Sequence, residues 1–287
     1  MDNAAATDVD IDGVRVPRLI YGTAWKEDAT ENLVAQALEQ GFRGIDTANQ
    51  RKHYFEAGVG AALSAAIASG RLRREDLFIQ TKFTYPRGQD HRLPYDADAP
   101  AGVQVAQSFE KSLEHLGADY VDSYVLHGPS TGGPLRPVDW LVWRAMEAIH
   151  GQGRARLLGV SNFTLEQLRL LCARAKIKPR FVQNRCYASR LWDKDIRAFC
   201  AGEGIRYQGF SLLTANRALL GHGGFKELAA RHGKTPSQVV FRFALDVGMI
   251  ALTGTTSRDH MAQDLDVFDF RLTPQEIDAV ENAARPR

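Results

Sequence analysis

Short strand-like segments alternate with helix-like segments along almost the whole chain, and this alternation constrains the fold more than any other feature. Each strand-like segment is apolar or β-branched, and each is followed by an amphipathic helical pattern. The eight strand-like segments cover residues 18–23, 42–46, 76–82, 119–127, 154–162, 180–184, 205–211 and 248–254. Alternating strands and helices predict a parallel sheet, and eight units in about 250 residues predict an α/β fold of the (β/α)8 TIM barrel type.

Further helical patterns occur late in the chain, at residues 225–234, 235–245 and 272–284. No low-complexity linker or change of composition divides the sequence. We therefore expect a single barrel domain over residues 1–287, with extra late helices and no long C-terminal tail.

The charge balance and the cysteines argue against several classes of protein. With 36 basic and 34 acidic residues the net charge is +2, so neither a nucleic-acid nor a membrane partner is expected. The N-terminus is acidic and lacks a signal-like apolar run, which favours a cytoplasmic protein, and a monomer is more plausible than an oligomer. Cys172, Cys186 and Cys200 lack CxxC spacing, so buried structural thiols are expected instead of disulfides or a metal site.

Polar residues and glycine-containing loops follow the strand-like segments. Active sites of such barrels lie at the C-terminal ends of the strands, so these residues are expected to converge on one rim. They are Gly22-Thr23, Asp46, Lys82, His127, Ser161-Asn162, Gln183-Asn184, Phe210-Ser211 and the run from Thr253 to Thr256.

Three of these residues, Asp46, Lys82 and His127, form a set of four with the nearby Tyr54, and this set has definite chemistry if its members meet. A nearby Lys82 ammonium would lower the pKa of a tyrosine such as Tyr54, and an Asp46 carboxylate would keep that lysine charged. A neutral His127 could hold a carbonyl oxygen against the phenol. Each residue also has a structural interpretation: Asp46 and Lys82 as an ion pair, His127 as a rim histidine, and Tyr54 as packing at a helix start.

The order of these motifs resembles the aldo-keto reductase superfamily. The resemblance rests on the four residues above together with GT at 22–23, GVSNF at 159–163, VQN at 182–184 and GTTS at 254–257. It implies an oxidoreductase in which NADPH, or NADH, passes a hydride to an aldehyde or ketone carbonyl. Tyr54 would be the general acid, Lys82 and Asp46 its tuning pair, and His127 the group that orients the substrate.

The resemblance also implies a cofactor site along the rim. Ser161, Asn162 and Gln183 would hold the carboxamide, and Phe210 would stack on the nicotinamide where the family usually has tyrosine. The implied cofactor-binding residues are Gly22, Thr23, Ser161, Asn162, Gln183, Phe210, Ser211, Leu213, Gly254, Thr255, Thr256, Ser257 and His260.

The sequence departs from the family pattern in two functional places. Seven residues separate Asp46 from Tyr54 where four are usual. The family tyrosine usually stands three residues before a glutamate, and His53 occupies that position relative to Glu56, which defines a variant KHY-x-E turn. Gly254 and His260 stand where a lysine and an arginine commonly bind the cofactor 2′-phosphate. Arg258 could substitute for them, so NADPH leads as the expected cofactor and NADH competes with it.

The missing tail predicts an open pocket mouth. Trp25, Tyr85 and the long loop 83–100 are expected to line it for a small carbonyl substrate, and the sequence does not choose among aldehydes, ketones, sugars and dicarbonyls. Two other functions stay open. One is a catalytically weak cofactor-binding sensor or regulatory subunit, and the other is a lyase that uses Lys82 as a Schiff-base amine.

Overall fold

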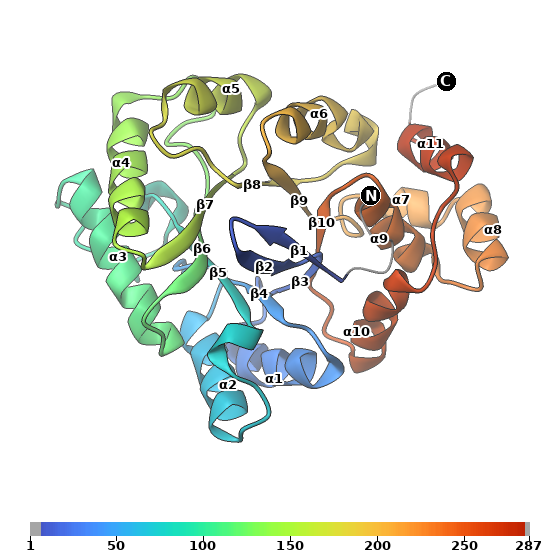
Figure 1. Cartoon of the computed structure of the whole chain (residues 1–287), viewed down its shortest axis with the longest axis horizontal. Helices are drawn as coiled ribbons and strands as arrows, with labels where there is room; N and C mark the ends of the chain where they lie inside the picture. The colour runs from blue at the N-terminus through green and yellow to red at the C-terminus, as the bar shows by residue number, and fades with distance from the viewer. Residues whose placement is uncertain (1–6, 285–287) are drawn as a thin grey trace.

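The computed structural model describes residues 7–284 and shows a closed parallel barrel (Figure 1). The expectations about the first residues of the chain and about its end at Arg287 concern residues 1–6 and 285–287, outside this range. The barrel order is β10-β3-β4-β5-β6-β7-β8-β9, which confirms the predicted (β/α)8 TIM barrel. The barrel strands are β3 (Leu19–Gly22), β4 (Gly44–Asp46), β5 (Phe78–Phe83), β6 (Val121–Leu126), β7 (Ala155–Ser161), β8 (Phe181–Arg185), β9 (Arg206–Phe210) and β10 (Ile250–Thr253).

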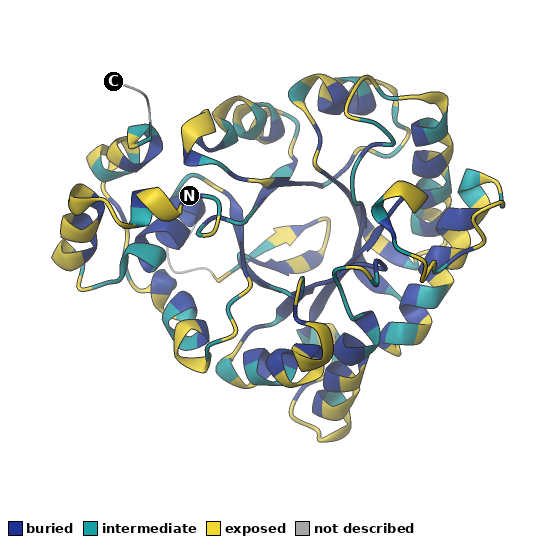
Figure 2. Ribbon diagram, turned by 180° about the vertical axis from the view of Figure 1, so that it is seen from behind, coloured by how far each residue is buried: buried dark blue, intermediate teal, exposed yellow. Residues whose placement is uncertain are grey.

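The helices surround the barrel and cover its outer face (Figure 2). They are α1 (Thr30–Gln40), α2 (Glu56–Ala68), α3 (Ala101–Leu116), α4 (Pro137–Gly151), α5 (Leu165–Arg174), α6 (Lys194–Gly202), α7 (Arg217–Leu220), α8 (Gly223–Arg231), α9 (Pro236–Asp246), α10 (Arg258–Leu265) and α11 (Pro274–Asn282). Short 3₁₀ turns lie at Glu27–Ala29, Arg74–Asp76, Pro86–Gly88, Ala188–Asp193 and Asp266–Phe268. Within residues 7–284, no helix has both the length and the apolar character needed to span a membrane.

The strand residues are buried on both faces because one face packs inside the barrel and the other against the helices. Every residue of β5, β6 and β10 is buried. Three outer helices begin with a capping box, in which Thr164, Thr235 or Thr273 accepts from the backbone three residues later. These caps place the helix starts that the sequence predicts at Thr235 and Thr273.

An N-terminal hairpin precedes the barrel and was absent from the sequence expectations. β1 (Asp8–Ile11) pairs antiparallel with β2 (Val14–Pro17). Its turn residues Asp12 and Gly13 have φ of 52° and 78°, the left-handed conformation that a tight Asp-Gly hairpin turn requires. Side chains of the hairpin form an apolar cluster with residues of five barrel strands. The buried members are Ile11, Val14, Val16, Ile20, Phe78, Leu157, Phe181, Ile250 and Leu252.

Candidate active site

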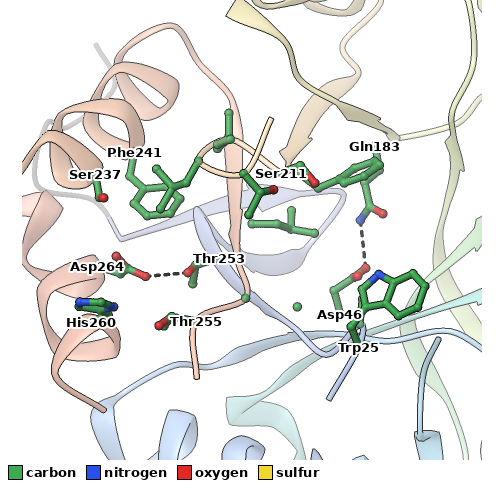
Figure 3. Close-up of a pocket in the computed structure, with 18 of the residues that line it drawn as sticks. Trp25, Asp46, Gln183, Ser211, Ser237, Phe241, Thr253, Thr255, His260 and Asp264 are labelled. Carbon is green, nitrogen blue, oxygen red and sulfur yellow. Dashed lines mark hydrogen bonds between the residues drawn. The ribbon is translucent and has the colours of Figure 1, made fainter. Parts of the chain in front are cut away.

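A cavity of about 510 Å³ opens beside the carboxyl ends of the strands (Figure 3). One end is lined by Trp25, Asp46, Tyr54, His127 and Gln183. The other end lies against α10 and α9, where Thr255, His260, Asp264, Ser237 and Phe241 line it. The cavity is therefore elongated and has two chemically different ends.

Asp46 and Lys82 form a buried ion pair below the first end. Lys82 Nζ donates to the two carboxylate oxygens of Asp46 at 2.7 and 2.6 Å and to the Thr47 carbonyl at 2.8 Å. An ammonium has three hydrogens, so these bonds use all of its donors. Burial lowers the pKa of Lys82, while the charge of Asp46 and its hydrogen bonds oppose this shift. The pairing that the sequence predicts is present, and it leaves Lys82 with no donor for another group.

A tight turn places Tyr54 above this pair. The backbone N–H groups of His53 and Tyr54 both donate to the Gln50 carbonyl at 3.0 Å. The Gln50 side chain donates to the Gly88 carbonyl at 2.6 Å and bonds the His53 ring at 2.9 Å. As a result, Lys82 Nζ lies 5.2 Å from the centre of the Tyr54 ring. The seven residues between Asp46 and Tyr54 are thus accommodated in a compact turn.

The pKa of the Tyr54 phenol shifts opposite to the sequence expectation. Burial raises this pKa, and the negative charge of Asp46 raises it further. The expected net lowering is wrong for this structure, because burial and the charge of Asp46 outweigh the effect of the Lys82 ammonium, whose hydrogens are used elsewhere. Tyr54 is therefore held as a neutral phenol, which is the form that can give a proton.

His127 contacts Tyr54 and is held neutral. The two rings meet edge to face with centroids 5.9 Å apart. Burial, the charge of Lys82 and His53 lower the pKa of His127 to about 3. Its Nδ1 lies 2.7 Å from the Thr84 hydroxyl. If that hydroxyl donates, the proton of the neutral ring is on Nε2, which can then donate to a carbonyl oxygen.

The structure divides the expected cofactor residues into two groups. Those that line the cavity are Gly22, Ser161, Gln183, Phe210, Ser211, Leu213, Gly254, Thr255 and His260. Four others, Thr23, Asn162, Thr256 and Ser257, lie outside the lining set. Thr23 instead donates to the Asp46 carbonyl at 3.0 Å, and Asn162 donates to the His127 carbonyl at 2.8 Å, so both support residues of the site.

Three residues around the site adopt positive φ, which is costly for residues other than glycine. Trp25 has φ of 63°, Asn162 of 58° and Ser211 of 55°. Each follows the end of a barrel strand, where the chain turns across the rim. Backbone conformation of this kind has no sequence signal apart from the tolerance of asparagine for it.

Of the two expected substrate residues, only one lines the cavity. The Trp25 side chain is 70% exposed at the mouth, and its ring lies 3.9 Å from that of His53. Tyr85 is buried instead: its hydroxyl donates to Asp139 at 2.9 Å and its ring packs edge to face on Phe83. These contacts turn Tyr85 away from the cavity, so its assignment to the substrate pocket is corrected.

Lys26 is a candidate binding residue that the sequence analysis missed. Its side chain is only 5% exposed, and Nζ donates to the Gly254 carbonyl at 2.8 Å. Among residues 7–284 it has no carboxylate partner in an ion pair. Burial lowers the pKa of Lys26 to about 8. The sequence shows a lysine in the loop after the first barrel strand, but it does not show that this lysine lies near Gly254.

Arg258 does not replace the missing cations at the cavity. It is exposed, and Nη1 lies 3.2 Å from Glu39 on α1. Asp264, another residue missed from sequence, is buried and lines the cavity where it accepts from the Thr253 hydroxyl at 2.6 Å (Figure 3). Burial raises the pKa of Asp264 to about 6. The adenosine end expected from the resemblance therefore carries a carboxyl group and no fixed cation from Arg258.

Sequence comparison gives the same assignment as the site. The profile of the Aldo/keto reductase family matches residues 18–285. An uncharacterized oxidoreductase of Bacillus subtilis (strain 168), YtbE, is 32% identical over 271 residues, covering 94% of this chain and 89% of that protein. Glyoxal reductase of the same organism is 33% identical over 272 residues, with the same coverage of both chains.

Solved structures agree with these relatives. The aldo-keto reductase AKR2E4 of Bombyx mori, determined in complex with NADP, superposes with a TM-score of 0.82 at 27% identity and covers 98% of this chain and 93% of its own. An aldo/keto reductase from Brucella melitensis gives a TM-score of 0.80 at 28% identity, covering 96% and 98%. With the family profile spanning nearly all of the sequence, the chain belongs to the aldo/keto reductase family.

Proposed function

We propose that this aldo/keto reductase uses NADPH to reduce an aldehyde or ketone to an alcohol, with Tyr54 as the proton donor. The observation that carries the proposal is the meeting of Asp46, Lys82, Tyr54 and His127 at one end of a long cavity. In the reaction, bound NADPH supplies a hydride to the carbonyl carbon. The phenol of Tyr54 gives its proton to the carbonyl oxygen.

The neighbouring residues support that proton transfer. Neutral His127 donates to the same oxygen and holds the carbonyl against the phenol. When the proton leaves Tyr54, a phenolate remains 5.2 Å, measured from the ring centre, from the Lys82 ammonium, which stabilises the new negative charge. The charge of Asp46 and its hydrogen bonds oppose the lowering of the Lys82 pKa by burial.

The fit of a dinucleotide rests on Lys26 and on the far end of the cavity. A buried ammonium without a carboxylate partner is costly unless an anion completes it. Lys26 does not itself line the cavity, but it donates to the carbonyl of Gly254, which does, and a cofactor diphosphate that crosses at Gly254 would come close to this ammonium. The N-terminus of α10, capped by Ser257, would receive the adenosine end. We favour NADPH because a similar structure was determined with NADP.

For the substrate we propose small aldehydes, including dicarbonyls. The mouth is open around the exposed Trp25 ring, and one relative is named a glyoxal reductase. A carbonyl oxygen is the only substrate group that Tyr54 and His127 require. The residues at the mouth therefore select among substrates by the group attached to the carbonyl.

A cofactor-binding sensor is the second candidate, and a specific observation favours it. Lys82 donates all three hydrogens to Asp46 and Thr47, so the phenol of Tyr54 receives no hydrogen bond from the ammonium, and burial and the charge of Asp46 raise its pKa. A protein with this arrangement could bind NADPH and turn over slowly.

The test measures NADPH and NADH consumption with glyoxal and with an activated aromatic aldehyde, for the unmodified protein, Tyr54→Phe and the control Tyr120→Phe, whose ring packs on Arg74 and Arg156 outside the cavity lining. We expect turnover in the unmodified protein, a loss of about 10² to 10⁴ in rate for Tyr54→Phe, and little change for Tyr120→Phe. NADPH binding, measured by titration, should be equal in all three. Tight NADPH binding without turnover would instead favour the sensor.

A further inference from the structure

A layer of three buried glutamines crosses the barrel directly below the active site. We call Gln80, Gln183 and Gln208 the amide layer. Gln80 lies on β5 and Gln208 on β9, four strands apart in a barrel of eight and therefore on opposite sides. Gln80 is the register partner of Asp46 on β4, and Gln183 is the register partner of Gln208. The layer thus joins two neighbouring pairs from opposite walls of the barrel.

The hydrogen bonds within the layer have a fixed direction. Gln208 Oε1 accepts from Gln80 Nε2 at 2.9 Å and from Gln183 Nε2 at 3.0 Å, while Gln208 Nε2 donates to Gln80 Oε1 at 3.1 Å. Gln80 Nε2 also donates to Asp46 Oδ1 at 2.7 Å, and Gln183 Nε2 donates to the same oxygen at 3.0 Å, the bond drawn in Figure 3. Reversing one amide would break several of these bonds at once.

This direction determines what Gln183 presents to the cavity. Both hydrogens of its Nε2 are used, one on Asp46 and one on Gln208. Gln183 lines the cavity, so the group left available there is its carbonyl oxygen, an acceptor. The same layer adds two donors to the Asp46 oxygen that already accepts from Lys82. Cofactor recognition and the charge of the catalytic pair therefore share one hydrogen-bond network.

We propose that Gln80 and Gln208 are positioning residues that fix the Gln183 amide with its acceptor toward the nicotinamide end of the cofactor. The inference rests on the proposed function, because it requires a nicotinamide cofactor in the cavity. Barrel interiors of this type are usually filled by bulky branched side chains, whereas here a buried, hydrogen-bonded polar layer occupies that place. Gln80 does not line the cavity and has no hydrogen bond to Gln183; it acts on Gln183 through their shared partners Asp46 and Gln208.

The experiment compares binding of NADPH with binding of 2′,5′-ADP, a fragment without the nicotinamide. The variants are Gln80→Met, which keeps the side-chain length and removes the hydrogen bonds, and Gln80→Glu, which keeps the side-chain shape and replaces the amide N–H donors by an acceptor oxygen. Gln104→Met on α3 is the matched control, since Gln104 is also a buried glutamine and donates to Ala97 and Ala99 far from the cavity.

For both Gln80 variants we expect Kd for NADPH to rise about tenfold, the effect of one lost hydrogen bond, and Kd for 2′,5′-ADP to stay within about twofold. Gln104→Met should leave both values unchanged. Loss of both ligands to the same extent, or of neither, would overturn the inference, as would wild-type binding by Gln80→Glu. If Gln80→Met does not fold, Gln208→Met makes the same comparison from β9.

The outcomes separate this inference from the proposed function. An unmodified protein that does not bind NADPH would refute the proposed function, and the inference with it. An unmodified protein that binds and oxidises NADPH, with Gln80 variants that bind it equally well, would refute the inference alone.

Discussion

Lys82 and Asp46 are joined through both carboxylate oxygens, at 2.7 and 2.6 Å, and both side chains are buried. The third hydrogen of the ammonium goes to the Thr47 carbonyl. Lys82 therefore acts on Tyr54 through its charge, across 5.2 Å to the ring centre, and not through a direct hydrogen bond.

Replacing Asp46 by asparagine should disable the catalytic pair. Burial already lowers the pKa of Lys82, so loss of the counter-ion lowers it further and favours the neutral amine. We expect the reduction rate to fall at least about 100-fold and the free energy of unfolding to fall by about 3–5 kcal/mol. Single-turnover kinetics and denaturant titration measure the two effects.

A double variant separates charge from structure in this pair. Asp46→Asn combined with Lys82→Met removes both charges and keeps an acceptor oxygen for Gln80 and Gln183, so much of the lost stability should return while the rate stays low. A double variant as active as the unmodified protein would show that the pair is only structural.

His127 should not limit the rate in mildly acidic solution. Its pKa is lowered from 6.5 to about 3, so the folded protein keeps the neutral ring while an unfolded chain takes up a proton below about pH 6.5. The contribution of His127 to folding stability is thus present above that pH and is lost as the pH falls toward 3. We expect kcat/KM of the unmodified protein not to fall between about pH 7 and pH 5 through protonation of His127. A fall in this range that disappears in His127→Gln would contradict this expectation.

Lys26→Met should weaken cofactor binding without removing the catalytic groups. A charge-assisted bond to a phosphate is strong, so we expect Kd for NADPH and for NADH to rise about tenfold or more. The pKa of Lys26 is lowered to about 8, so the ammonium is charged below this pH and binding should weaken as the pH rises through it. Titrations over that pH range measure both effects.

Arg258→Met is the control for Lys26, because Arg258 is exposed and pairs with Glu39 on α1. Its cofactor affinity should equal that of the unmodified protein. A larger loss in Arg258→Met than in Lys26→Met would reverse the assignment of the phosphate-binding cation.

The N-terminal hairpin should contribute stability and no chemistry. Val16 is fully buried in the cluster at the hairpin, so Val16→Ala should lower the free energy of unfolding by about 2–3 kcal/mol. Val103→Ala on α3 removes the same atoms from a side chain that is 44% exposed, so it should change the free energy of unfolding little. Equal losses in the two variants, or a changed kcat in Val16→Ala, would contradict this role.

Much of the barrel and part of the site could be predicted because their signals are local. Each strand is a short apolar run, and Asp46, Lys82 and His127 each follow or end one. The hairpin was also readable, since alternating apolar residues flank Asp12-Gly13, and it was overlooked.

Other features depend on partners far away in the chain. Lys26 meets Gly254 across 228 residues, and Gln80 meets Gln208 across 128, so neither role has a local pattern. Gln80 lies two residues before Lys82, and strand alternation puts both on the same face, but this alone does not name a partner. The raised pKa of Tyr54 depends on burial and on the nearby charge of Asp46, which only the three-dimensional contacts decide.

The pairing of β10 with β3, at Ala251 and Leu19, makes the first and last barrel strands neighbours. During synthesis the barrel therefore cannot close until nearly the whole chain has left the ribosome. The bond between Lys26 and Gly254 spans this same seam. A chain that ends before β10 would lack the end of the cavity that lies against α10. Dinucleotide binding would therefore require a completely closed barrel, and a bound dinucleotide would contact both sides of the seam.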